Sequence, residues 1–409
     1  MLDPRPTDTV TGLLAEIADV GRDRQRGGYS RPVFSTAERD LGDWFTTHAE
    51  RRGLDVHTDH NGILWATMGD LSSGGAVVTG SHLDSVPGGG AFDGPLGICS
   101  ALVAVDLLKA RGAWPGRPLA IAVFPEEEGS RFGVACLGSR LLTGAIDADR
   151  ARTLTDDDGS TFAEIASRSG LDPRFIGADD GTLAAIGTFL ELHVEQGRGL
   201  IDLGRPVGIA RSILGHGRWR ITATGQGNHA GSTLMADRRD PMIAAARIIV
   251  AVRDAALALP DARATVGRLT PVPGGTNVIA SRVDFWLDVR HPDDATTAAV
   301  VYGISAAAER IAAEEGCSVR IVEESVSGTV DFPAGLRERL SRILPDGPQL
   351  ATGAGHDAGV LSARVESAML FVRNPTGISH SPEEHVEPDD AEAGATALAD
   401  ALQGLLSEN

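Results

Sequence analysis

Apolar and polar positions along the first half of the chain follow two alternating patterns. Continuous apolar runs are typical of strands buried on both faces of a sheet, and strand-like runs occur at residues 54–57, 63–68, 76–79, 118–124 and 189–194. Apolar residues at helical spacing predict helices at 7–21, 35–53 and 96–108, with Ser35 and Glu38 as a capping box for the second. Strands that alternate with helices predict an α/β fold layered around a central sheet.

The pattern changes at about residue 212. Apolar and polar residues then alternate with period 2, which predicts strands at 218–224, 264–269, 283–289 and 318–323, and helices follow at 240–257 and 295–315. We therefore expect an inserted α+β domain at 212–327, whose sheet has one face covered by two helices.

The α/β pattern returns near the end of the chain. A strand is predicted at 368–372 and a helix at 389–406. We therefore expect residues 1–211 and 328–409 to form one domain, interrupted by the insertion. The polar stretch 144–187 is interpreted as a solvated surface with short helices.

Composition narrows the range of partners. The chain has 409 residues and a formal net charge of −19, which argues against nucleic acid or an anionic membrane as a partner. Its three cysteines are scattered, so a reducing cytoplasm is the natural compartment. No continuous apolar segment marks a signal peptide near the N-terminus, and the apolar run at 248–250 is too short to span a bilayer. We expect a cytoplasmic protein.

One glycine-rich loop carries a strong chemical signal. After the apolar run at 76–79, the chain offers the imidazole nitrogen of His82 and the carboxylate oxygen of Asp93, which are typical metal ligands. Asp84 is close enough in sequence to hold the His82 ring from behind. Taken alone, a histidine in such a loop could equally be a capped surface residue.

Further candidate ligands follow the later strands, where α/β sheets usually place functional groups. They are Glu127 or Glu128, His193, and a late histidine, either His380 or His385. Imidazoles and carboxylates without a thiolate suit two divalent ions, either zinc or manganese, with cobalt a further possibility. The remaining glutamate would be the general base. The alternative is that the acidic triplet at 126–128 forms a solvated turn.

The same motifs occur, in this order, in a known family. They are residues 80–86, 92–94, 127–132, 191–197, 228–231, 277–279, 288–290, 355–358 and 379–382. Over nearly its whole length the chain resembles the dinuclear metal amidohydrolases, which include allantoate amidohydrolase, N-carbamoyl-L-amino-acid hydrolase and β-ureidopropionase. The resemblance implies a catalytic α/β domain and an inserted domain that serves as lid and dimerisation surface.

The resemblance also implies a ligand set for two divalent metal ions. The metal ligands would be His82, Asp93, Glu128, His193 and His380, with Asp93 bridging the two ions. Glu127 would be the general base, and Asp84 would support His82 from behind. His385 falls outside the matching motif, so we interpret it as a nearby surface histidine.

The inserted domain would supply groups that bind the substrate. His229 resembles the histidine that acts on the active site of the partner subunit, which implies a homodimer. Asn277 and Arg290 resemble the pair that binds the substrate carboxylate, and an arginine fork bonds a carboxylate at two points. Further substrate contacts are expected at Gln196, His216 and Gly359.

The residues alone leave alternatives open in this domain. Arg290 could instead form a structural salt bridge with Asp288 or Asp293, and His229 could cap a turn. Leu234 stands where the family usually has proline, which removes a restraint on φ close to His229.

The expected activity is hydrolysis of the ureido C–N bond of a small anionic N-carbamoyl compound, with release of ammonia and carbon dioxide. Because the candidate contacts are polar, we favour allantoate, a compound of purine catabolism, over N-carbamoyl-L-amino acids. The alternatives of another class are a metallopeptidase or deacylase on the same scaffold, and an inactive homologue that only binds. An inactive homologue is expected to lack a metal ligand or the general base, whereas this chain has all five candidate ligands and Glu127.

Overall fold

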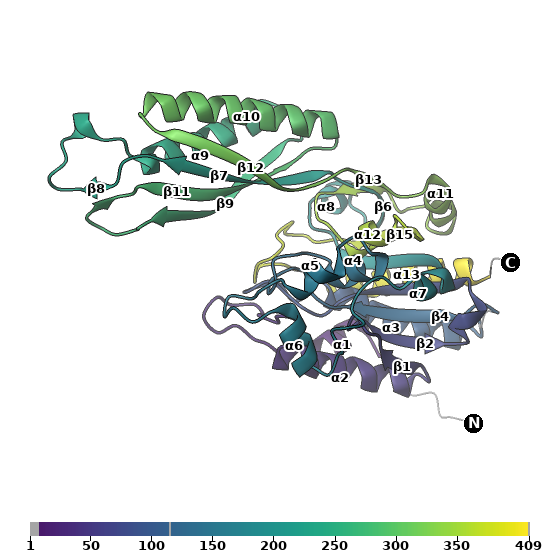
Figure 1. Ribbon diagram of the computed structural model, residues 1–409. Coiled ribbons are helices and arrows are strands. Elements are labelled where there is room, and N and C mark those ends of the chain that lie inside the picture. Colours follow the sequence, from purple (N-terminus) through teal and green to yellow (C-terminus); the bar gives the residue numbers. More distant parts are fainter. Residues whose placement is uncertain (1–7, 114–115, 408–409) are drawn as a thin grey trace. The chain divides into compact units, whose positions relative to one another are not determined.

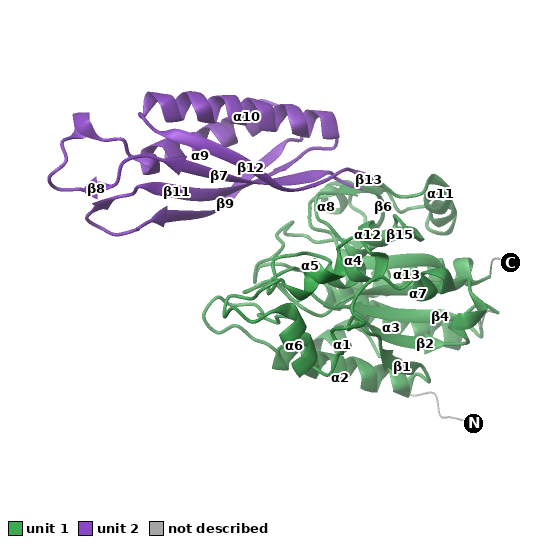
Figure 2. Cartoon of the chain, viewed as in Figure 1, with its two compact units in different colours: residues 1–212, 331–409 green, residues 213–330 purple. Residues whose placement is uncertain are grey.

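The computed structural model describes residues 8–113 and 116–407. The chain forms two compact units, which Figure 2 shows in different colours. Unit 1 comprises residues 1–212 and 331–409, and unit 2 is the intervening segment 213–330. The fold is α/β with a large mixed sheet, as predicted from the alternating patterns.

Within the described residues, unit 1 is built on a nine-stranded mixed sheet (Figure 1). The strands β4, β3, β5 and β15 are neighbours and run parallel, while β1, β2 and β6 are antiparallel to their neighbours. The strands are β1 (Asp55–Thr58), β2 (Leu64–Met68), β3 (Ala76–His82), β4 (Leu119–Phe124), β5 (Ile186–Val194), β6 (Val207–Ile213), β13 (Val330–Asp331), β14 (Gln349–Thr352) and β15 (Glu366–Val372). Every residue of β3 and β4 is buried, because helices cover both faces of the parallel strands.

The helices of unit 1 form two groups around this sheet. In the first, α3 and α13 pack side by side against β3, β5 and β15, and α1 contacts both helices. In the second, α4 contacts α7 and α12, which reach β5. The helices are α1 (Val10–Glu16), α2 (Thr36–Arg51), α3 (Pro95–Ala110), α4 (Leu137–Thr143), α5 (Ala148–Arg152), α6 (Phe162–Arg168), α7 (Asp180–Ala185), α8 (Gly199–Leu203), α11 (Ala334–Ile343), α12 (Asp357–Leu361) and α13 (Pro388–Leu406), with a 3₁₀ turn η1 (Leu71–Ser73).

Unit 2 contains an antiparallel four-stranded sheet in the order β12-β7-β11-β9. The predicted alternation of apolar and polar residues is confirmed, since every second residue of β7 and β11 is buried against α9 and α10. The elements are β7 (His216–Thr224), β8 (Asn228–His229), η2 (Met235–Asp237), α9 (Pro241–Leu257), β9 (Arg263–Val272), β10 (Val278–Ile279), β11 (Arg282–Arg290), α10 (Asp294–Glu314) and β12 (Ser318–Ser327). The short strands β8 and β10 pair with each other.

The N-terminal helices differ from the prediction in two details. α1 ends at Glu16, and the guanidinium of Arg31 donates to the carbonyls of Ile17 and Val20 in the turn that follows, at 3.1 and 3.0 Å. Residue 7, where this helix was predicted to begin, lies outside the described residues. The predicted capping box at α2 is only half formed. The Ser35 side chain accepts from the Glu38 amide, but the Glu38 carboxylate accepts from the amide of residue 34.

Residues 144–187 form more than the solvated surface that we expected. They contain the short helices α5, α6 and α7, and their apolar residues also form a small core of their own. This cluster includes Ile146, Phe162, Ile165 and Ile176, all buried. Among the described residues, no helix has the length and apolar character that crossing a membrane requires.

Candidate metal centre

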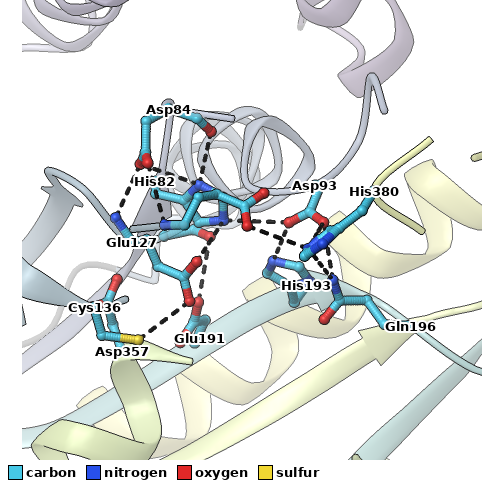
Figure 3. Close-up of polar contacts among 12 residues, drawn as sticks. His82, Asp84, Asp93, Glu127, Cys136, Glu191, His193, Gln196, Asp357 and His380 are labelled. Carbon is cyan, nitrogen blue, oxygen red and sulfur yellow. Dashed lines mark hydrogen bonds and ion pairs between the residues drawn. The ribbon is translucent and has the colours of Figure 1, made fainter. Parts of the chain in front are cut away.

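The carboxyl ends of three neighbouring parallel strands carry the candidate ligands of unit 1. β3 ends at His82, which is in register with Phe124 at the end of β4, and Glu127 and Glu128 follow β4. β5 carries His193 near its own end. The hydrogen-bonding register of the sheet therefore brings these side chains to one edge, where the loop with Asp93 joins them (Figure 3).

A first cluster consists of His82, Asp93 and His193. The Nε2 atoms of His82 and His193 lie 3.4 and 3.2 Å from Asp93 Oδ1, and all three side chains are buried. Each Nδ1 faces a backbone carbonyl at 3.0 Å, of Asp84 and Val194 respectively. A carbonyl only accepts, so each Nδ1 carries a proton, and each Nε2 is the atom that can bind a metal.

Among the residues that the structure describes, the buried Nε2 atoms of both rings find no hydrogen-bond partner. Buried polar atoms are costly when left without a partner, and these two point at one carboxylate oxygen. Two nitrogens and an oxygen are a donor set that suits zinc or manganese. The residues therefore fit a divalent ion.

The electrostatic environment of the first cluster favours positive charge. Burial opposes the charged form of Asp93, yet the adjacent rings of His193 and His82 hold the pKa of its carboxyl well below its usual range. Burial likewise opposes protonation of His82, yet the neighbouring carboxylates, Glu127 first among them, raise its pKa well above the usual value. A field that favours a proton on this ring also favours a cation.

A second cluster shares Asp93 and adds Glu128 and His380. His380 Nε2 lies 3.4 Å from Asp93 Oδ2 and 3.2 Å from Glu128 Oε2. Asp93 thus presents Oδ1 to the first cluster and Oδ2 to the second, which is the geometry of a carboxylate that bridges two ions. The side chain of His380 is half exposed, so the second cluster is the more open of the two.

Glu127 lies beside the first cluster without belonging to it. Its Oε2 is 3.7 Å from His82 Nε2, and its Oε1 accepts a hydrogen bond from Cys136 Sγ at 3.4 Å (Figure 3). Burial raises the pKa of the Glu127 carboxyl well above its usual value. A buried carboxylate with raised pKa beside a metal site has the properties of a general base.

Asp84 supports this site through two kinds of contact. Its backbone carbonyl accepts from His82 Nδ1, with its Oδ1 3.5 Å from the same nitrogen. Its carboxylate oxygens also accept from the amides of Glu127 and Glu128, at 3.2 Å each. Asp84 therefore ties the histidine of β3 to both glutamates after β4.

Gln196 and Gly359, which were predicted to contact the substrate, lie in unit 1. Gln196 Nε2 donates to Asp93 Oδ2 at 2.9 Å and lies 3.4 Å from His380 Nε2, so it contacts the second cluster itself. Gly359 is part of α12, and its amide donates to the carbonyl of His356. His385 makes an ion pair with Glu387 and does not join either cluster.

Several buried polar residues around the site escaped the sequence analysis. Glu384 Oε1 accepts from the amides of Phe92 and Asp93, at 2.9 Å each, and its Oε2 accepts from Ser379 Oγ. Glu384 thereby fixes the Asp93 loop to the segment that carries His380. Its place two residues after the motif 379–382 was the only sequence signal.

Two more buried polar residues lie behind His193, inside the motifs 191–197 and 355–358 but without a role predicted for them. Glu191 and His356 have ligand atoms within 4.8 Å of that ring, and both side chains are buried. Glu191 Oε2 accepts from the Ala358 amide, which fixes α12 to β5. His356 packs on the His193 ring at 4.4 Å between centroids.

In unit 2, His229 and Asn277 lie close together, because β8 pairs with β10. The Asn277 carbonyl accepts from the Ala230 amide at 2.9 Å. His229 Nδ1 accepts from the amides of Gly231 and Ser232, at 3.1 and 3.2 Å. Since Nδ1 accepts, the neutral ring carries its proton on Nε2, which is exposed and can act as a donor.

Leu234 lies in the loop after His229, at the position where the resemblance led us to expect proline. Leu234 has φ of −62°, close to the value that a proline ring imposes. Arg238 donates to the carbonyls of Ala230 and Thr233 and so holds the loop from the other side. The φ angle of Leu234 is therefore one that a proline could also adopt at this position.

Arg290 and His216 are paired residues on β11 and β7. The Arg290 guanidinium donates to both oxygens of Asp288, at 2.7 and 3.0 Å, so the salt bridge that was one of our alternatives is present. Burial and the charge of Arg290 lower the pKa of His216 to about 4, which keeps its ring neutral near pH 7.

Comparisons with known proteins agree with the motifs. A profile of peptidase family M20/M25/M40 matches residues 78–404. The N-carbamoyl-L-amino acid amidohydrolase of Geobacillus stearothermophilus is 35% identical, over 94% of this chain and 95% of the relative. The allantoate amidohydrolase of Bacillus subtilis is 32% identical over 97% of each chain. The resemblance to the amidohydrolases is confirmed.

A solved structure shows the same fold. The chain superposes on an amidase of the hydantoinase/carbamoylase family from Burkholderia vietnamiensis with a TM-score of 0.89 and 30% identity, over 100% of both chains. Members of the matched family typically depend on two metal ions, which agrees with the two clusters that share Asp93.

Proposed function

The chain belongs to peptidase family M20/M25/M40 and is a hydrolase of C–N bonds, and from this we propose that it hydrolyses the ureido group of N-carbamoyl compounds, with allantoate as its substrate. The observation that carries the proposal is the pair of clusters that share Asp93, with Glu127 beside them. His82 and His193 would hold one ion, and Glu128 and His380 the other. Zinc and manganese fit this set of ligands best, and cobalt is a further candidate.

Two divalent ions bound here would supply Lewis acidity, which lowers the pKa of water and polarises the carbamoyl carbonyl. Glu127 is placed to take a proton from the attacking water and to return it to the leaving nitrogen. The resulting carbamic acid decomposes to carbon dioxide and ammonia. The Nε2 proton of His229 suits an oxyanion, because backbone amides fix the opposite nitrogen as an acceptor.

We choose between the candidate substrates by the chemistry of the residues that we propose to bind them. Arg290 and Asn277 would bind the carboxylate, with Gln196, His216 and Gly359 around the rest of the molecule. Allantoate carries a second polar ureido arm where an N-carbamoyl-L-amino acid has a side chain, and these residues are polar. N-carbamoyl-L-amino acids are the second candidate, favoured by the relative at 35% identity.

We also propose a homodimer in which His229 acts on the site of the partner subunit. Three exposed apolar residues of α9, Ile243, Val250 and Leu257, recur every seven positions and form one stripe. α9 packs against β9, which is an edge strand of the unit 2 sheet. An apolar stripe beside an open edge is suited to pairing with a second copy.

The cysteines are free thiols, which supports the proposal of a reducing cytoplasm as the compartment of this protein.

The test is ammonia release by the purified protein loaded with manganese or zinc. Allantoate and a panel of N-carbamoyl-L-amino acids are assayed in parallel, and the Glu127→Gln variant is the control. We expect ammonia from allantoate and a loss of turnover of at least about 10²-fold in the variant, with both ions still bound. Ammonia from the carbamoyl amino acids alone would reassign the substrate. Undiminished turnover by the variant would remove Glu127 from the role of base.

A further inference from the structure

Cys136 makes a direct contact with the carboxylate that we assign as the base. Its Sγ donates to Glu127 Oε1 at 3.4 Å, and Figure 3 shows the thiol on the side of Glu127 away from Asp93. The other oxygen, Oε2, lies 3.7 Å from His82 Nε2. The thiol therefore engages one oxygen of the carboxylate and leaves the second directed at the metal ligands.

The backbone fixes the position of this thiol. The Cys136 amide donates to the Glu127 carbonyl at 2.7 Å, and the Cys136 carbonyl accepts from Ser139 Oγ. Cys136 has φ of 55°, a conformation that costs about 1–2 kcal/mol for a residue with a Cβ atom. Backbone strain of this kind persists only where the surroundings enforce it, and it often marks a functional position. The loop that carries Glu127 thus also aims Sγ at its side chain.

A thiol suits this place chemically. Cys136 is buried, and burial together with the charge of Glu127 raises the pKa of its thiol well above the usual value, so the sulfur keeps its proton. An S–H group is a weak donor. It can orient a carboxylate without withdrawing as much basicity as a cationic donor would.

We propose that Cys136 is a positioning residue for the reaction, which holds the Glu127 carboxylate so that Oε2 faces the attacking water. The inference rests on the proposed role of Glu127 as base. Cys136 would not touch the substrate or the metals. Nothing in the sequence motifs marked it, because it lies nine positions beyond Glu127 in a segment of small residues.

The first test is a set of variants with kinetics of the metal-loaded enzyme. We expect Cys136→Ala to lower kcat about three- to tenfold with KM unchanged, which corresponds to one modest hydrogen bond. Cys136→Ser keeps a donor and should restore most of kcat. Cys99→Ala is the matched control, a buried cysteine of α3, and should leave kcat as in the wild type.

A double-mutant cycle separates positioning from a general structural effect. The shorter side chain of Glu127→Asp cannot reach Sγ, so Cys136→Ala should have no further effect on kcat in that background. An equal loss of kcat in both backgrounds would overturn the proposal. So would a wild-type kcat in the Cys136→Ala enzyme while Glu127→Gln is inactive. A fully active Glu127→Gln enzyme would instead remove Glu127 from the role of base, which is the premise of this inference.

A spectroscopic test needs neither turnover nor a variant at position 136. The infrared S–H stretching band of a thiol moves to lower wavenumber when the thiol donates to a carboxylate. We expect one of the cysteine bands to move to higher wavenumber in Glu127→Gln, because an amide is a weaker acceptor. Identical S–H bands in the two proteins would contradict the contact.

Discussion

Asp93 determines the chemistry of the site at the scale of single residues. Each oxygen of its carboxylate faces a different cluster, while Glu384 accepts from its amide and Ser379 Oγ donates to its Oδ2. A residue with one oxygen could serve one cluster only. Asp93 is therefore the single side chain on which both candidate metal positions depend.

The pKa of His216 predicts a pH dependence of stability. Its folded value of about 4 lies below the ordinary value of 6.5, so below pH 6.5 the unfolded chain binds a proton that the folded chain does not. Stability should therefore fall as the pH drops from 6.5 towards 4, by about 1–2 kcal/mol at pH 5. Urea unfolding at pH 5 and pH 8 measures this difference.

The matched variant is His216→Gln, which cannot titrate. The difference in unfolding free energy between pH 8 and pH 5 should be smaller in this variant by about the same 1–2 kcal/mol. An identical difference in both proteins would show that His216 is not the group responsible.

The residues of the motifs could be predicted from the sequence, whereas the contacts that hold them in place from distant parts of the chain could not. The apolar strands pointed to Glu127 or Glu128, to His193 and to a late histidine, and the resemblance to the amidohydrolases singled out Glu127 and His380. Glu384 contacts Asp93 from 291 positions away, and no local pattern reveals such a contact. The contact of Asp84 with the His82 ring was predicted, but its hydrogen bonds from the amides of Glu127 and Glu128 depend on how β3 and β4 lie side by side.

At the scale of elements, the start of α3 controls the position of His82. Gly94 precedes the helix with φ of 84°, and a Cβ atom there would lie 2.6 Å from Nδ1 and Cε1 of His82. We expect Gly94→Ala to displace the ring and to lower metal affinity at least about tenfold. Metal content after dialysis, measured by mass spectrometry, tests this expectation.

The opposite end of α3 supplies the matched control. Gly112 also has positive φ, at 62°, but a Cβ atom there would meet no described residue within 4 Å. Gly112→Ala should therefore cost a similar backbone strain of about 1–2 kcal/mol without a change in metal content. Equal metal loss in both variants would attribute the effect to helix stability rather than to the His82 contact.

Long periodic elements were predictable and short irregular ones were not. The predicted strand 283–289 is one residue shorter than β11 at each end, and the predicted helix 389–406 begins one residue after α13, because strong periodicity defined both. α1 ends before the predicted residue 21, and the turn after it is held by hydrogen bonds from Arg31, a contact that no local pattern reveals. Strands β6, β13 and β14 were missed, since two of them are short and all depend on partners elsewhere in the sheet.

At the scale of the whole molecule, the proposed dimer makes each active site depend on two chains. A mixture of Glu127→Gln and His229→Ala chains, refolded or exchanged together, should recover about a quarter of the wild-type activity. In a mixed dimer, the site with intact Glu127 receives the intact His229 of the other subunit. If His229 acted on its own chain, every site in the mixture would lack one group. An inactive mixture with demonstrated subunit exchange would contradict the arrangement.

The number of divalent ions bound per chain tests the central claim most directly. Equilibrium dialysis against manganese, followed by elemental analysis, would be applied to the wild type, His380→Ala and Asp93→Ala. We predict two ions, one ion and none, because His380 serves one cluster whereas Asp93 serves both. A single ion in the wild type, or two ions retained in Asp93→Ala, would contradict a centre built on one shared carboxylate.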